Sequence, residues 1–233
     1  DATDCDGFRV DAIKHVEYNW IKKWADDMRK HAATRGKNDF IIFGEYFSYD
    51  NGALASFCKD AGYSFNSALF FPLSQNIKNV FVDGQGSGQL TQQLNNKGQY
   101  GEGANRLVAF IDNHDLNRIA LMNGGDTAND VWKLKPALSF LYLATPVPCL
   151  FYGTEHAFDQ GGHWNGSNKT EDNPDDGDWQ RECMFDKGFQ PGPAQGNKLA
   201  ATDAPLYQHI AALNRARANH ASLRRGSFTE RWS

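Results

Sequence analysis

Strand-like and helix-like segments alternate along most of the chain, and this alternation limits the folds that the chain can adopt. Phe8 and Val10 alternate with charged residues, a period of two that indicates a short strand, and apolar positions within 17–30 recur at helical spacing. Further strands are expected at 40–43, 64–71, 106–112 and 147–152, and further helices at 53–59, 73–81, 89–95, 130–144 and 204–218. Repeated units of this kind predict a parallel sheet wrapped by helices, as a barrel or an open doubly wound sheet.

Composition excludes several classes of protein. The formal net charge of −4 argues against a nucleic-acid or anionic-membrane partner, and no apolar run approaches the roughly 18 residues that a membrane span requires. The four cysteines are scattered without a C-x-x-C pair, so neither a zinc site nor a disulfide scaffold is indicated. Cys5 and Cys149 lie in apolar, strand-like contexts and are expected to be buried thiols. Residues 159–204 are polar and rich in Gly, Asn, Asp and Pro, which predicts a long surface loop.

Acidic residues follow the predicted strands. They are Asp11, Glu45, Asp115 and Glu155. Because the carboxyl ends of parallel strands meet at one edge of a sheet, and active sites of barrels and doubly wound sheets lie at that edge, these side chains are candidates for catalysis. No strand is followed by a Gly-x-Gly-x-x-Gly or Walker-type loop, so a nucleotide site is not supported.

Two of these carboxylates have the neighbours that glycosidic hydrolysis requires. The reaction needs one carboxylate to attack or stabilise the anomeric carbon and one carboxylic acid to protonate the leaving oxygen. Arg9 lies two residues before Asp11, on the same face of the strand, where its charge would keep Asp11 ionised. Glu45 has aromatic neighbours, where desolvation would keep it protonated; they are Phe43, Tyr46 and Phe47. From these residues alone, a purely structural Arg9–Asp11 pair is an equal alternative.

A third carboxylate and several aromatic residues fit a sugar substrate. Asp115, next to His114, could stabilise positive charge that grows on the sugar ring. Aromatic rings just past strand ends could stack on sugar faces, with core packing as the alternative; they are Tyr46, Phe47, Tyr49, Tyr152 and Trp164.

Three segments resemble signature motifs of the α-amylase family and occur in the same order. They are Gly7-Phe-Arg-Val-Asp-Ala-Ile-Lys-His15, Phe43-Gly-Glu-Tyr-Phe47 and Phe110-Ile-Asp-Asn-His-Asp115. The resemblance covers nearly the whole chain. Within the family, the chain is most similar to cyclodextrin glucanotransferases and their relatives. It implies an α/β fold, a (β/α)8 TIM barrel, of which residues 1–228 would hold about strands 4–8 and their helices. Residues 229–233 would begin a C-terminal β-domain, and the N-terminal half of the barrel would lie outside this chain.

The resemblance also implies a role for each matching residue. Asp11 would be the nucleophile, Glu45 the general acid and then base, and Asp115 the stabiliser of the oxocarbenium-like transition state. The implied substrate-binding residues are Arg9, Lys14, His15, Phe47, His114 and Arg181. The backbone carbonyl of His15 matches a ligand of a structural calcium ion, most of whose ligands would lie outside this chain.

The implied function is retaining hydrolysis of α-1,4-glucosidic bonds in starch or maltodextrins by double displacement, in a secreted protein. Cyclodextrin glucanotransferase-type transglycosylation and a non-catalytic glucan-binding fragment are the alternatives. Ala68 matches a position where the glucanotransferases carry an aromatic residue that binds the acceptor sugar, which favours water as acceptor. The expected partners are an α-glucan and the N-terminal half of the barrel, without which this chain alone is not expected to be a competent enzyme.

Overall fold

The computed structural model describes residues 3–58, 65–122, 127–162, 179–185, 196, 201–226 and 228. The chain divides into two compact units, which are described separately here. The first unit comprises residues 1–76, 87–109 and 230–233, and the second comprises residues 77–86 and 110–229.

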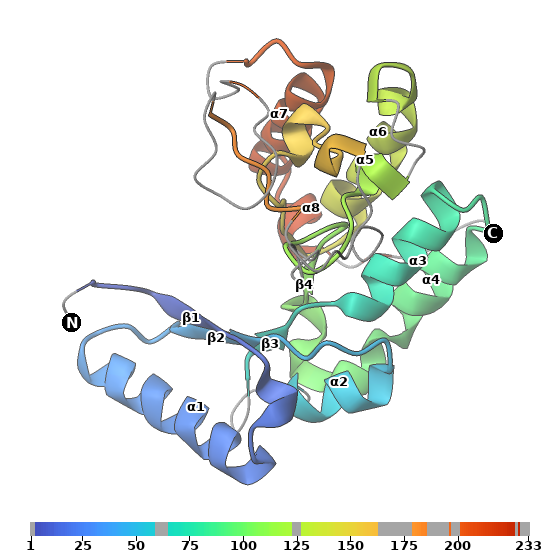
Figure 1. Cartoon of the computed structure of the whole chain (residues 1–233). Helices are drawn as coiled ribbons and strands as arrows, with labels where there is room; N and C mark the ends of the chain where they lie inside the picture. Colours follow the sequence, from blue (N-terminus) through green and yellow to red (C-terminus); the bar gives the residue numbers. More distant parts are fainter. Residues whose placement is uncertain are drawn as a thin grey trace, which may run out of the picture. The chain divides into compact units, whose positions relative to one another are not determined.

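A three-stranded parallel sheet organises the first unit. Its strands are β1 (Gly7–Val10), β2 (Ile41–Gly44) and β3 (Ser67–Ala68), in the spatial order β1-β2-β3 (Figure 1). The predicted parallel pairing is therefore confirmed. A bridge between Leu69 and Val108 continues the parallel arrangement from β3 to β4 (Val108–Ala109).

Helices cover this sheet and join its strands. The longer ones in the first unit are α1 (Tyr18–Thr34), α2 (Asn51–Cys58), α3 (Phe71–Phe81, whose last five residues belong to the second unit) and α4 (Gly88–Asn95). Two 3₁₀ segments, η1 (Ile13–His15) and η2 (Asn96–Asn105), connect them. The Glu17 side chain accepts a hydrogen bond from the Trp20 N–H at 2.6 Å and so caps α1. Ile21 and Ala25 of α1 are buried with Ile42 of β2, so the helical spacing of α1 forms the core under the sheet.

The second unit is mainly helical. Its elements are α5 (Ile119–Met122), α6 (Thr127–Ala144), β5 (Val147–Pro148), η3 (Thr154–His156), η4 (Gln160–Gly162), α7 (Pro205–Asn219) and α8 (Ser222–Arg225). The buried Arg217 of α7 donates four hydrogen bonds to backbone carbonyls, at 2.6 to 3.1 Å. One of them belongs to Tyr142 in the last turn of α6, where carbonyl groups lack partners within the helix. Arg217 therefore ties the end of α6 to α7.

Several predicted elements differ from the structure in length. The strands expected at 64–71, 106–112 and 147–152 contain only two strand residues each, and 71 already begins α3. Apolar residues at 69–71 and 107–111 are buried whether or not they pair, so an apolar run overstates strand length. The predicted helices are confirmed with shifted ends. Of the predicted loop at 159–204, the greater part lies outside the described residues, as do residues 229–233.

The prediction that Cys5 and Cys149 are buried is wrong. Cys149 is exposed and Cys5 is partly exposed, because both flank short strands with incompletely buried residues. The buried thiols are those of Cys58 and Cys183. Within the described residues, no helix is both long and apolar enough to cross a membrane.

Candidate active site

The ends of β1 and β2 bring the first two predicted carboxylates together. Val10 pairs with Gly44 in the parallel register, so the residues that follow, Asp11 and Glu45, emerge at the same edge of the sheet. Arg9 lies between their side chains: its Nη1 is 2.5 Å from Asp11 Oδ1, and its Nη2 is 3.8 Å from Glu45 Oε2. One planar guanidinium group thus faces both carboxyl groups.

Backbone hydrogen bonds fix Glu45 against the turn that follows Asp11. The Glu45 N–H donates to Val10 O at 2.8 Å, and the Ile13 N–H donates to Glu45 O at 3.0 Å. Ala12 has a left-handed backbone, with φ of 48°, and its N–H donates to Glu45 Oε2 at 2.8 Å. A side-chain carbon at Gly44 would lie 2.4 Å from Ile13 Cδ1, so a larger residue before Glu45 would force the buried Ile13 side chain to shift. A strained non-glycine turn therefore holds this carboxylate in one position.

Exposure separates the two carboxylates. The side chain of Asp11 is 68% exposed, whereas that of Glu45 is 9% exposed. An exposed carboxylate paired with Arg9 is accessible to an incoming sugar carbon. A buried carboxyl group with a fixed orientation can deliver or remove a proton at one defined atom.

Lys14 and Phe47 lie together at the same edge. Lys14 Nζ donates to Phe47 O at 3.1 Å and lies 5.4 Å from the centre of the Phe47 ring. The Phe47 ring packs on Phe71, with ring centres 4.6 Å apart, and on Tyr49 at 6.0 Å. His15 ends η1 with an exposed side chain. The six predicted site residues of the first unit thus lie on β1, on the turn and η1 that follow it, and on the segment after β2.

The other aromatic candidates for sugar stacking have different environments. Tyr46 packs against Phe57 at 4.9 Å and belongs to the border of the core, which favours the core-packing alternative. Tyr49 and Tyr152 are 45% and 39% exposed, so their rings stay available to a ligand. Trp164 lies outside the described residues.

The second unit holds the remaining predicted residues in one cluster. His114 Nε2 is 3.2 Å from Asp115 Oδ2, and Arg181 Nη2 is 3.9 Å from Asp115 Oδ1. The Asn113 side chain accepts the Asp115 N–H at 2.9 Å and so fixes the turn that presents Asp115. Gln180 donates a hydrogen bond from its side chain to the carbonyl of His114. Arg181, 66 residues after Asp115 in the chain, is thus its neighbour in space.

Sequence reasoning missed the buried polar residues beneath this cluster. Asp112 is 2% exposed and accepts hydrogen bonds from the Ile119 N–H at 3.1 Å and the Thr154 hydroxyl at 2.9 Å. Burial raises the pKa of Asp112, and the nearby Arg118 partly opposes the shift. Arg118 and Glu182 form a fully buried ion pair at 3.1 Å. The sequence does not indicate this pair: Arg118 and Glu182 have opposite charges, but nothing local links two residues so far apart.

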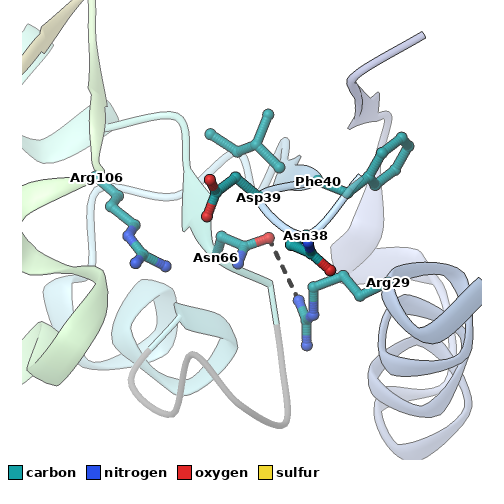
Figure 2. A pocket seen from close by; sticks show the side chains of 7 residues that line it. Arg29, Asn38, Asp39, Phe40, Asn66 and Arg106 are labelled. Carbon is teal, nitrogen blue, oxygen red and sulfur yellow. Dashed lines mark hydrogen bonds between the residues drawn. The ribbon is translucent and has the colours of Figure 1, made fainter. Parts of the chain in front are cut away.

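A separate cavity of about 310 Å³ lies at the opposite ends of β2 and β3, around the residues that precede them (Figure 2). Its lining residues are Arg29, Asn38, Asp39, Phe40, Ile41, Asn66 and Arg106. Arg29 Nη1 donates to Asn66 Oδ1 at 3.4 Å, as Figure 2 shows. The lining contains one carboxylate, Asp39, so it cannot supply the pair that glycosidic hydrolysis requires. The candidate site is therefore at the Asp11–Glu45 edge.

The described residues contain no side-chain cluster of the kind that commonly binds metal ions. They include no group of three or more His, Cys, Asp or Glu side chains that could hold a metal ion. Calcium takes six to eight oxygen ligands, and the His15 carbonyl would be one of them.

Comparison with known proteins agrees with the motif pattern. The family model for the α-amylase catalytic domain matches residues 1–226. An α-amylase of Streptomyces lividans is 28% identical over 236 residues, which cover 98% of this chain and 25% of that protein. A cyclomaltodextrin glucanotransferase of a Bacillus species (strain 38-2) is 32% identical over 158 residues, which cover 67% of this chain and 20% of that enzyme.

Solved structures of an α-amylase and of a cyclodextrin glucanotransferase also match this chain. The γ-cyclodextrin glucanotransferase of alkalophilic Bacillus clarkii matches with a TM-score of 0.71 and 25% identity, over 100% of this chain and 29% of that one. An Anoxybacillus α-amylase matches with a TM-score of 0.68 and 26% identity, over 96% of this chain and 42% of that one. The chain spans a quarter or less of the two sequence relatives described above. Its parallel strands and helices are consistent with part of a (β/α)8 domain. The chain belongs to the α-amylase catalytic-domain family of glycoside hydrolases.

Proposed function

We propose that the protein hydrolyses α-1,4-glucosidic bonds in starch or maltodextrins with retention of anomeric configuration. The observation that carries this proposal is the position of Arg9 between an exposed carboxylate, Asp11, and a buried one, Glu45. Retaining glycosidases need two carboxyl groups about 5–5.5 Å apart with different tasks. The shared guanidinium of Arg9 and the unequal exposure of Asp11 and Glu45 are compatible with different tasks for the two carboxyl groups.

In the first step, an Asp11 oxygen attacks the anomeric carbon while Glu45 gives its proton to the leaving glycosidic oxygen. The bond to the leaving sugar breaks, and a covalent bond between the sugar and Asp11 forms. In the second step, Glu45 takes a proton from water, and the resulting hydroxide oxygen displaces Asp11 from the same carbon. Arg9 orients Asp11 through the 2.5 Å contact in the free protein.

The proposal gives the remaining predicted residues binding roles. Asp115 would stabilise the positive charge that develops on the sugar ring, while His114 and Arg181 would bind hydroxyl groups beside it. Lys14, His15 and Phe47 would contact the sugar on the leaving-group side. These assignments rest on the family motifs and on the two local clusters.

Transglycosylation is the second candidate, since relatives include both amylases and glucanotransferases. Ala68 does not weigh against transglycosylation. Ala68 is fully buried in β3, opposite Gly44 of β2, so its small side chain carries no information about a sugar acceptor. Phe47, with Lys14 over its ring, is an aromatic candidate for holding an acceptor sugar. Product analysis must therefore distinguish water from a sugar as acceptor.

Two further expectations stay part of this proposal. A structural calcium ion would be bound partly by the carbonyl of His15 and would support the turn that follows Asp11. Secretion of the protein is proposed from the family resemblance alone.

The test is digestion of soluble starch and maltoheptaose by the intact protein, with separation of linear and cyclic products. Hydrolysis predicts linear reducing sugars, and transglycosylation predicts cyclic or lengthened glucans. Proton NMR of the first product must show the α-anomer. Asp11→Asn is expected to abolish activity, whereas Asp6→Asn is the matched control, because Asp6 is exposed and pairs with Lys37 before β1. Full activity of Asp11→Asn, or a β-anomer as first product, would refute the mechanism, and glucan binding without any cleavage would favour a non-catalytic role.

A further inference from the structure

We propose that Arg118 is a positioning residue for the proposed active site: together with Glu182 and Gln160, it holds the segment 179–183 so that Arg181 faces Asp115. The inference rests on the proposed function, which places Asp115 and Arg181 in contact with the sugar. Neither the family comparisons nor the sequence motifs assign a role to Arg118.

Arg118, Gln160 and Glu182 form a closed ring of hydrogen bonds. The Arg118 N–H donates to Gln160 Oε1 at 2.6 Å, and the Gln160 N–H donates to Glu182 Oε1 at 2.9 Å. Arg118 Nε then donates to Glu182 Oε2 at 3.1 Å and completes the ring. All three residues are fully buried. Each residue of the ring is bonded to the other two. Because the ring is buried, a residue that moves would lose these hydrogen bonds without gaining bonds to solvent.

The guanidinium of Arg118 is further enclosed by aromatic rings. Its central carbon lies 4.1 Å from the centre of the Phe151 ring, 5.1 Å from that of Tyr152 and 5.6 Å from that of Phe158. Arg118 Nη1 also donates to Tyr152 O at 2.6 Å. A lysine ammonium would keep the charge but could not make both the bond to Glu182 and the bond to Tyr152 in this planar geometry. The site therefore requires arginine.

Gln160 supports the same interpretation. Its φ is 62°, in the left-handed region that side chains rarely adopt. Such a conformation persists when surrounding bonds determine it, and here the ring engages both the side chain and the N–H of Gln160. The left-handed backbone of Gln160 thus accompanies the bonds that hold Glu182 in place.

The ring reaches the proposed substrate cluster through the segment 179–183. Residues 180, 182 and 183 are buried, whereas residue 181 between them is partly exposed. Glu182 is anchored by Arg118, and Gln180 is anchored by its bond to the carbonyl of His114. Arg181, between two anchored neighbours, points outward, with Nη2 3.9 Å from Asp115 Oδ1. Release of Glu182 would thus displace Arg181 without any change in Arg181 itself.

The experiment compares Arg118→Lys with Arg217→Lys in the intact protein. Arg217 is the matched control, because it is also a buried arginine of the second unit. Its hydrogen bonds go to carbonyls of residues 142–146 and 223 and not to the segment 179–183. Both variants are expected to lower the melting temperature. Only Arg118→Lys should lower kcat/KM on maltoheptaose, by about 10²-fold, the loss typical of a misplaced binding group.

A double-mutant cycle with Arg181→Ala separates positioning from general destabilisation. If Arg118 acts through Arg181, then Arg118→Lys should change kcat/KM by no more than about twofold in the Arg181→Ala background. The melting temperature should fall equally in both backgrounds. Equal losses of kcat/KM in both backgrounds, or an equal loss in Arg217→Lys, would overturn the inference.

A second measurement does not depend on activity. Hydrogen–deuterium exchange at the amides of residues 180–182 should accelerate in Arg118→Lys and stay unchanged in Arg217→Lys. Unchanged exchange in Arg118→Lys would overturn the anchoring. If exchange accelerates but the unmodified protein cleaves no glucan, the proposed function fails and the anchoring stands.

Discussion

Replacing Glu45 by glutamine tests its chemistry apart from its part in the fold. The Glu45 carboxyl group has polar contacts with the Ala12 N–H at 2.8 Å and with Arg9 Nη2 at 3.8 Å. The side-chain carbonyl of glutamine can still accept the first, and only the charge in the second is lost. The free energy of unfolding should therefore fall by less than about 1 kcal/mol, as for an ion pair with a partly exposed partner.

The catalytic effect should be much larger. A positioned general acid contributes about 10²–10⁴-fold to the rate, which corresponds to about 2.7–5.4 kcal/mol in activation free energy. Glutamine cannot give a proton to the leaving oxygen of starch. An α-maltosyl fluoride carries a leaving group that needs no proton. The rate of the first step with this substrate should therefore fall far less in Glu45→Gln than the rate with starch. The assay compares initial rates of Glu45→Gln on starch and on the fluoride, with thermal unfolding of the same samples.

The comparison of the two substrates decides the role of Glu45. A large loss on starch with a small loss of fluoride release supports the general acid. Equal losses on both substrates would mean that Glu45 is needed for something other than protonation of the leaving group. Full activity on starch would refute the role altogether.

Further predictions concern the fold and its ionisable groups. Arg217→Met should lower the free energy of unfolding by about 2–4 kcal/mol, because four hydrogen bonds to carbonyls are lost, and a change below about 1 kcal/mol in urea unfolding would contradict this. Burial raises the pKa of the Cys58 thiol to about 12, so N-ethylmaleimide near neutral pH should label the exposed Cys149 well before Cys58, and equal labelling rates by mass spectrometry would count against it. Because burial raises the pKa of Asp112 in the folded state, its contribution to stability is present below the unfolded pKa of about 3.9 and is lost as pH rises through the folded pKa. The stability of the unmodified protein relative to Asp112→Asn should therefore decrease as pH is raised from about 4, and a constant or increasing difference in urea unfolding would oppose this sign.

Local patterns were enough to predict much of the first unit. The alternation at residues 8–10 and the apolar run at 40–43 locate the two strands whose ends carry Asp11 and Glu45. Both features are local: the first is an alternation with the period of a strand, and the second is a short apolar run typical of a buried strand. The contact between Arg9 and Asp11 follows from their spacing by two along one strand.

Other features depend on residues that are distant in sequence. The contact of Arg9 with Glu45 needs the register of β1 and β2, and the ion pair of Arg118 with Glu182 joins residues 64 apart. No local period encodes either contact. The left-handed turn at Ala12 was also unpredictable, because alanine is not a residue that favours positive φ. Strained and long-range features of this kind occur at the Asp11–Glu45 edge of the first unit and around Arg118 in the second unit, where the local rules are least informative.

In the proposed mechanism, Asp11 becomes covalently bound to the sugar. The most direct measurement is mass spectrometry of the intact protein after reaction with a 5-fluoroglycosyl fluoride of an α-glucan, which slows the second step and lets the intermediate accumulate. One added glycosyl group is expected on the peptide that contains Asp11, and none in Asp11→Asn. A glycosyl group on Glu45 or Asp115, or turnover with no covalent adduct and an inverted product, would contradict it.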